Sequence, residues 1–258
     1  IIINGLKRLE YRGYDSAGIA LLSSTNNLNI YKKKGKVKAL EDETINQDIS
    51  GTIGIGHTRW ATHGEANDLN AHPHFNSNED LAVIHNGIIE NYYSLKTELQ
   101  SRGYVFRSDT DTEVLVHLIE DILKNAQVNL EEAVRLALNE VIGAYAIVVI
   151  SKKDPDKLIV AKLSSPLVVG FGENELFVAS DGSPLIEHSK KVSYLEDGQM
   201  AILHRDGNLE VKSIKDNETH VPYIDELQLK LEEIEKGGFE HFMMKEIHEQ
   251  PIAIKNSI

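Results

Sequence analysis

The sequence predicts an α+β fold built from largely antiparallel sheets. Strand-like segments come first, a block of helices follows, and a longer series of strand-like segments comes after the helices. Strict alternation of strands and helices, which would indicate a parallel sheet, is not seen. With 258 residues, 41% of them hydrophobic, the chain is long enough to bury a sizeable core. We therefore expect two sheets covered by helices.

The first part of the chain is predicted to hold one helix and four strands. Ile2, Leu6 and Leu9 form an apolar helical stripe, and Gly13 marks the end of this helix. The basic run at 32–38 is interpreted as the solvated end of a strand and the start of a helix. Residues 61–80 are expected to form a long loop, which in a compact domain is uncommon and usually functional or disordered. The strands are placed at 16–22, 28–33, 51–58 and 81–87.

Helices and then strands are predicted for the remainder. Asn129, followed three residues later by Glu132, resembles a capping box at the start of a helix. Amphipathic helices are expected at 90–103, 111–125 and 129–141. Strands are expected at 144–150, 157–163, 166–172, 175–180, 192–195, 199–204 and 209–214. Further helical segments are expected at 181–189, at 224–236 and at the end of the chain.

Composition excludes several classes of function. The formal charge of −13, from 40 acidic and 27 basic residues, disfavours nucleic acid and anionic membranes as partners. No apolar run approaches the ~20 residues that span a bilayer, and no signal peptide is recognisable, so a cytoplasmic protein is expected. The absence of cysteine excludes disulfides and a cysteine nucleophile within these residues. The helical stripe at the start and the periodic pattern at the end predict a piece of a longer chain.

The segment HTRWATHG, residues 57–64, is the first candidate site. Arg59 offers a planar fork that suits a carboxylate or phosphate. Thr62 and His63 could add hydrogen bonds to the same anion, and Trp60 could cover a small ligand. In the alternative interpretation Trp60 belongs to the core and Arg59 pairs with an acidic residue. Spacing alone leaves both interpretations open.

Two further motifs carry candidate residues. The amide of Asn86 and the backbone N–H of Gly87 could donate to an oxyanion, although an isolated HNG is also typical of a tight turn. Asp111 precedes a helix and could serve as its cap or bind an ammonium group. No metal site is expected. The histidines at 57, 63, 72, 74 and 85 include no helical His-x-x-x-His pair and lie near no carboxylate cluster.

The motifs in their order resemble one family. The succession LEYRGYDSAG, HTRWATHG, AHPH, HNGIIEN, SDTDTEV, SPLVVG, ASD and KEIHEQP closely resembles the glutaminase domain of the glutamine–fructose-6-phosphate aminotransferase (isomerizing) family. EYRGYDSAG and KEIHEQP favour it over other class II amidotransferases. The resemblance covers nearly the whole chain. It implies an N-terminal-nucleophile hydrolase fold with four layers, αββα, and no metal or organic cofactor.

The resemblance also implies domain boundaries and a reaction. Residues 1–236 would form the glutaminase domain without its first strand, and residues 237–258 a linker helix toward a sugar isomerase region. The family hydrolyses glutamine to glutamate and ammonia through a thioester on an N-terminal cysteine. The α-amine of that cysteine, with a pKa of about 7.7–8.0, serves as the base. The strand with this cysteine is expected to precede residue 1, and without it the chain would be inactive.

The resemblance assigns roles to residues of this sequence. Arg59, Thr62 and His63 would bind the glutamine α-carboxylate, and Asp111 with the Gly87 carbonyl would bind the α-ammonium. Asn86 and the Gly87 N–H would form the oxyanion hole. The remaining members of the set are Trp60 on the closing loop, His72 beside it, and Arg12 and Gly13 flanking the nucleophile.

The family further implies partners. Downstream isomerase domains would bind fructose 6-phosphate, receive the ammonia and make glucosamine 6-phosphate, and the full-length protein is expected to be a homo-oligomer. Two alternatives remain open: an inactive glutamine-sensing domain, and a class II glutaminase that serves another ammonia acceptor. A metal-binding module is a more distant alternative.

Overall fold

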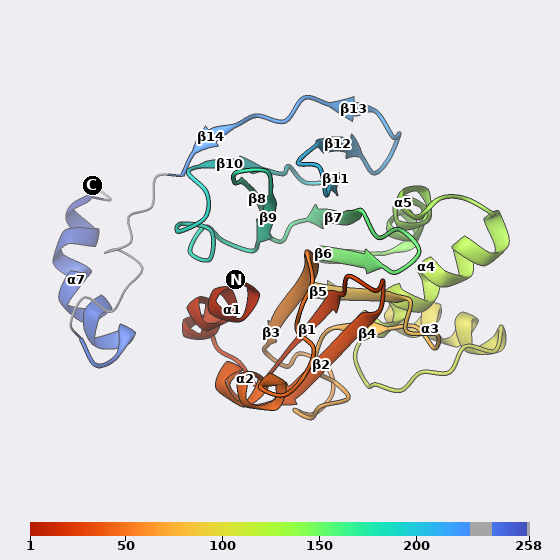
Figure 1. The fold of residues 1–258 in the computed structure, drawn as a ribbon, viewed down its shortest axis with the longest axis horizontal. Helices are drawn as coiled ribbons and strands as arrows, with labels where there is room; N and C mark the ends of the chain where they lie inside the picture. The colour runs from red at the N-terminus through yellow and green to blue at the C-terminus, as the bar shows by residue number, and fades with distance from the viewer. Residues whose placement is uncertain (228–238, 257–258) are drawn as a thin grey trace.

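The computed structural model describes residues 1–227 and 239–256. Two short helices and five strands come first (Figure 1). They are α1 (Ile2–Leu9), the 3₁₀ turn η1 (Glu10–Arg12), β1 (Ser16–Leu22), β2 (Leu28–Lys34), α2 (Val37–Thr44), β3 (Ile53–Arg59), β4 (His74–Phe75) and β5 (Leu81–Ile89). Three helices follow: α3 (Tyr92–Ser101), α4 (Thr112–Ala126) and α5 (Leu130–Glu140).

The rest of the described chain is mostly strands. They are β6 (Gly143–Ser151), β7 (Lys157–Leu163), β8 (Val168–Phe171), β9 (Leu176–Ala179), β10 (Lys191–Tyr194), β11 (Gln199–His204), β12 (Leu209–Ser213), β13 (Thr219–His220) and β14 (Asp225–Glu226). The described part ends with α7 (Phe242–Asn256). No helix among the described residues is both long and apolar enough to cross a membrane.

The described strands form three sheets. Their orders are β2-β1-β3, β14-β10-β8-β9 and β13-β12-β11-β7-β6-β5-β4. Every pair of these strands is antiparallel. The antiparallel arrangement predicted from the order of the elements is thus confirmed.

The seven-stranded sheet is buried on both faces. Along β6, Ile147 and Val149 pack in the core cluster that includes α4 and α5. Ala146, Val148 and Ile150 alternate with them and pack against the other two sheets. A third cluster joins α1 and α2 to β1, so these two helices cover the sheet β2-β1-β3 (Figure 1).

Four layers result, in the order helices, strands, strands, helices, as expected. The outer layers are α1 with α2 and α3 to α5, and the seven-stranded sheet is one inner layer (Figure 1). The second inner layer consists of two separate sheets rather than one, with β3 at the edge of the first and β9 at the edge of the second.

Most predicted elements are confirmed, including a cap. Glu132 N donates to Asn129 Oδ1 at 2.9 Å, which is half of the expected capping box. The expected loop at 61–80 contains the short strand β4, which pairs with β5. The prediction of a helix at 181–189 is wrong, because this segment is a series of turns. Asp181 Oδ1 accepts the N–H of Ser183 at 2.8 Å, and this local bond competes with helix formation.

The predictions for the C-terminal part of the chain are confirmed only in part. The final helix is confirmed as α7. In the helix expected at 224–236, Asp225 and Glu226 instead form β14, which pairs with β10. Residues 228–236 of that prediction, and with them the domain boundary at 236/237, lie outside the described residues.

Candidate functional site

A cavity of about 340 Å³ lies among α1, β3, the end of β5 and β9. Every residue that the sequence assigned to the site lines it. These residues are Arg12, Gly13, Arg59, Trp60, Thr62, His63, His72, Asn86, Gly87 and Asp111. The fold therefore brings the whole predicted set together, although its members come from η1, β3, β5 and three loops.

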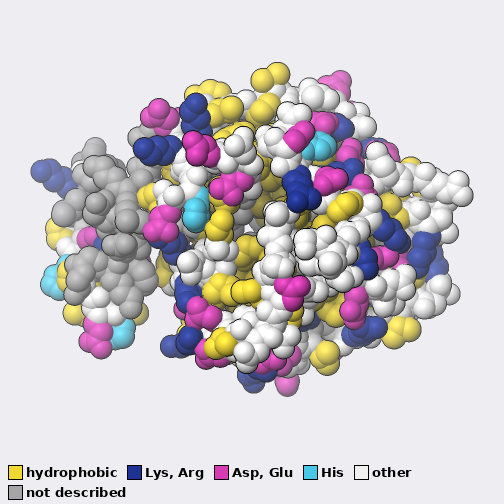
Figure 2. Space-filling view, in the orientation of Figure 1, with side chains coloured by type: hydrophobic (Ala, Val, Ile, Leu, Met, Phe, Trp, Pro, Cys, Tyr) yellow, Lys and Arg dark blue, Asp and Glu magenta, His cyan; other side chains and the backbone are white. Residues whose placement is uncertain are grey.

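One part of the cavity is an apolar slot between the edge strands β3 and β9. Ile55, Val148, Leu167 and Val178 are among the side chains that line it. Figure 2 shows hydrophobic side chains in the hollow between the upper and lower parts of the molecule. Both edge strands have one side without a partner strand among the described residues. The slot thus combines apolar walls with two rows of backbone hydrogen-bonding groups.

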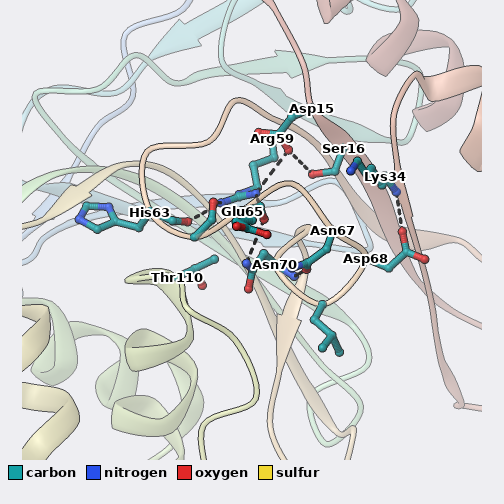
Figure 3. Close-up of polar contacts among 12 residues, drawn as sticks. Asp15, Ser16, Lys34, Arg59, His63, Glu65, Asn67, Asp68, Asn70 and Thr110 are labelled. Atoms are coloured by element: carbon teal, nitrogen blue, oxygen red, sulfur yellow. Dashed lines mark hydrogen bonds and ion pairs between the residues drawn. The ribbon is translucent and has the colours of Figure 1, made fainter.

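Arg59 ends β3 at the polar part of the cavity. Only 3% of its surface is exposed, and its guanidinium donates to the carbonyls of His63, Gly64 (2.9 Å) and Glu65 (3.3 Å). Asp15 Oδ1 lies 3.4 Å from it. Figure 3 shows the loop after β3 wrapped around this side chain. Arg59 therefore meets both interpretations, because it pairs with an acidic residue and also lines the cavity.

Trp60 lies over Gly13 at the cavity. With 67% of its surface exposed, Trp60 is not a core residue. A Cβ atom at position 13 would lie 1.9 Å from Trp60 Cε3, so only glycine lets the indole approach this closely. Beyond Trp60, His63 packs edge-on against Tyr92 with 5.1 Å between ring centroids.

Asn86 and Gly87 lie near the end of β5, paired with β6. Gly87 has φ +131°, and a Cβ there would lie 2.0 Å from the carbonyl oxygen of Ala144. Glycine is required at this position for both reasons. Asn86 Oδ1 lies 2.9 Å from His57 Nε2.

Asp111 occupies the N-cap position of α4 but does not cap it with its side chain. Instead Asp111 Oδ2 accepts the N–H of Ile89 at 2.8 Å, which ties the end of β5 to the start of α4. Its exposed fraction is 3%. A buried carboxylate thus lies on the cavity wall that also carries Gly87.

Arg12 connects two distant parts of the chain at the cavity. Arg12 Nη1 donates to Ser180 Oγ at 2.7 Å and lies 3.3 Å from Asp181 Oδ2. These contacts join η1 to the segment directly after β9. The Ser180 hydroxyl therefore serves as a structural contact of Arg12.

Four buried histidines lie at the polar part of the cavity: His57, His72 and His85, which line it, and His74, which does not. The Thr112 hydroxyl lies 2.9 Å from both His72 Nε2 and His85 Nδ1. His74 Nε2 lies 3.0 Å from the Thr110 hydroxyl. We call these four residues the histidine cluster.

The histidine cluster is uncharged at neutral pH. Burial lowers the pKa of His57 to about 4. It also lowers the pKa of His85, and those of His72 and His74 fall well below the usual value. Sequence reasoning did not assign His57, His85 or Thr112 to the site. The alternation along β3 could have indicated His57, since positions 55, 57 and 59 all face inward.

Comparison with known families identifies the domain. Residues 41–227 match the glutamine amidotransferase domain family. The chain is 58% identical over 254 residues to a Bacteroides thetaiotaomicron protein named glutamine–fructose-6-phosphate aminotransferase (isomerizing). The alignment covers 98% of this chain and 41% of that relative. A Chlorobaculum tepidum protein of the same name is 55% identical, with 99% and 42% covered. The chain thus spans about two fifths of the length of these relatives.

Solved structures show the same fold. Glutamine phosphoribosylpyrophosphate amidotransferase from B. subtilis matches with a TM-score of 0.71 and 27% identity, over 83% of this chain and 46% of that one. A class II glutamine aminotransferase domain protein from Silicibacter pomeroyi has a TM-score of 0.54 and 15% identity, over 78% and 91%. The fold is therefore that of the N-terminal-nucleophile amidotransferases. The chain belongs to the glutamine amidotransferase domain family, and is homologous to the glutaminase half of glutamine–fructose-6-phosphate aminotransferase.

Proposed function

We propose that this domain hydrolyses the side-chain amide of L-glutamine to glutamate and ammonia. The observation that carries the proposal is the gathering of all the predicted site residues around one cavity. This cavity offers a cation, a carboxylate and oxyanion donors to a single small ligand. The size of the cavity, about 340 Å³, is within the range of small-molecule sites.

The charges suit an amino-acid zwitterion. Arg59, with Thr62 and His63, binds the α-carboxylate, and Asp111 with the Gly87 carbonyl binds the α-ammonium. Support comes from the burial of both Arg59 and Asp111, because buried charges interact more strongly with a ligand than exposed ones do. His72 contributes to the wall, and Trp60 closes over the ligand.

The reaction proceeds in two steps, formation of a thioester and its hydrolysis. A cysteine thiolate attacks the amide carbon, the C–N bond breaks, and the thiol proton leaves with the nitrogen as ammonia. Water then attacks the thioester, releasing glutamate and restoring the thiol. Asn86 Nδ2 and the Gly87 N–H stabilise the oxyanion of both steps, each donor contributing about 3–4 kcal/mol.

We place the nucleophile on an extended segment in the apolar slot. No cysteine is among the 258 residues, and we propose that a further strand of the full-length protein supplies it. The edges of β3 and β9 supply hydrogen-bond partners for such a strand, and Ile55 and Val148 supply apolar contacts. Arg12 and Gly13 flank its first residue.

The ammonia acceptor follows from the relatives. Those from B. thetaiotaomicron and C. tepidum are named for the transfer to fructose 6-phosphate. We propose the same acceptor for the full-length protein, bound by isomerase domains that follow α7.

The test measures glutamate and ammonia release from glutamine by the full-length protein and three variants. N86A removes an oxyanion donor and is expected to lower kcat about 10²- to 10³-fold. D111N keeps the acceptor for Ile89 N–H but removes the charge, so it should raise KM for glutamine. D109N is the matched control, because Asp109 is exposed and does not line the cavity.

The outcomes separate the alternatives. Glutamine binding without glutamate release would favour the inactive glutamine-sensing domain. Release of ammonia that never reaches fructose 6-phosphate would favour another acceptor. Equal kinetics of D109N and D111N would contradict the role of Asp111.

A further inference from the structure

The side-chain amide of Asn86 can point either its oxygen or its nitrogen toward the cavity. Its oxygen and its nitrogen point in different directions, and only the nitrogen can donate a hydrogen bond to an oxyanion. In the structure Oδ1 lies 2.9 Å from His57 Nε2. No other hydrogen bond fixes this amide within the described part of the chain. The contact with His57 therefore decides which way the amide faces.

His57 is held firmly enough to make this choice. Its exposed fraction is 8%, it lies on an inward-facing position of β3, and its ring packs on His72 with 4.3 Å between centroids. Because burial keeps the pKa of His57 near 4, the ring is neutral and carries one N–H. With the proton on Nε2, the ring donates to Asn86 Oδ1. The opposite tautomer would accept from Asn86 Nδ2 and turn the oxygen toward the cavity.

We propose that His57 is a positioning residue for amide hydrolysis: its Nε2–H holds Oδ1 of Asn86, so that Nδ2 faces the cavity as an oxyanion donor. His57 itself does not touch the substrate in this role. The inference rests on the proposed glutaminase function, and it names the group that prepares the oxyanion hole. A charge on the ring is not required, since either the neutral Nε2–H form or the imidazolium donates to Oδ1.

The test compares two replacements of His57 in the full-length protein. H57Q places a side-chain N–H near the position of Nε2, whereas H57L has similar bulk and no donor. We expect H57L to lower kcat for glutamine hydrolysis about 10- to 100-fold with KM within about twofold of the original. H57Q is expected to stay within about threefold in kcat.

A binding measurement shows whether H57L still has a folded site. The γ-carboxylate of the product glutamate is planar and shares its charge between two oxygens, so H57L should change the Kd for glutamate by less than about threefold. The γ-aldehyde analogue of glutamine forms a tetrahedral adduct with the thiol, and H57L should bind it at least about tenfold more weakly. H117Q is the matched control, because His117 is also buried but lies on α4, away from the cavity. It should cost stability without changing kcat.

The failures are distinguishable. An unaltered protein that releases no glutamate overturns the glutaminase function itself. An active unaltered protein with equal kcat in H57L overturns the role of His57. An equal fall in H57Q and H57L also overturns it, because the lost N–H would then not be the cause.

Discussion

The histidine cluster and the single buried histidine of α4, His117, have opposite electrostatic surroundings. The histidine cluster contacts hydroxyl groups and other imidazole rings. His117 on α4 lies 3.5 Å from Glu113 Oε1 and 3.8 Å from Glu120 Oε2. Burial lowers the pKa of His117, but the two carboxylates outweigh this effect and raise it above the usual value.

The comparison teaches that burial alone does not fix the charge of a histidine. Near the cavity, burial disfavours protonation of His57, and so do the neighbouring His85 ring and the Arg59 cation. On α4, by contrast, the pKa values of Glu113 and Glu120 are themselves lowered to about 2, so both carboxylates stay ionised beside His117. The site keeps neutral rings, which can act as fixed hydrogen-bond donors and acceptors. On α4, two buried carboxylates instead favour the protonated form of His117.

The largest expected effect is acid destabilisation through the histidine cluster. A histidine whose folded pKa is lowered contributes stability above its unfolded pKa of about 6.5, and this is lost as pH falls toward the folded value. For His57, with a folded pKa of about 4, the loss between pH 7 and pH 5 should be about 2 kcal/mol, and the other three histidines should add to it in the same direction. Urea unfolding of the domain at pH 7, 6 and 5 measures this. A free energy of unfolding that is constant or rises toward pH 5 would contradict the prediction.

A smaller effect is expected from breaking the hydroxyl bridge of the cluster. T112V removes the group that contacts both His72 and His85, and leaves their buried nitrogens without that partner. We expect a loss of about 2–3 kcal/mol in the free energy of unfolding at pH 7. T112S keeps the hydroxyl and should lose less than about 1 kcal/mol. If both variants lose the same amount, the hydroxyl is not responsible.

The smallest expected effect concerns the charges around His117 on α4. E120Q removes one of the two charges that face His117, so the pKa of His117 should fall. The histidine cluster should titrate as before, because it lies at the cavity and not on α4. NMR titration of the imidazole signals measures both. An unchanged His117 would show that Glu113 alone sets its pKa.

Much of the fold and the site could be predicted from sequence. The short apolar runs of β1 and β7, each bounded by polar residues, were placed at their observed bounds, because such a run is too short for a buried helix and long enough for a buried strand. Arg59 and Asn86 could be grouped because polar residues at strand ends commonly meet. The motif order then supplied the roles that remain proposed.

The rest depends on contacts that local patterns do not encode. Arg12 meets Ser180 across 168 positions, and Arg59 binds backbone carbonyls, which every residue has. The Thr112 hydroxyl contacts the His72 and His85 rings, which come from other segments of the chain. The division of one β layer into two sheets reflects pairing between strands, and strand periodicity says nothing about pairing.

Trp60 has a spectroscopic consequence. It is the single tryptophan of these 258 residues, and its indole lies exposed at the cavity wall beside Gly13. Indole emission shifts to shorter wavelength when water is excluded from the ring. Within this domain, selectively excited fluorescence therefore comes from the mouth of the site alone. The emission wavelength therefore shows, without any attached dye, whether the loop after β3 is open to water or lies over a ligand.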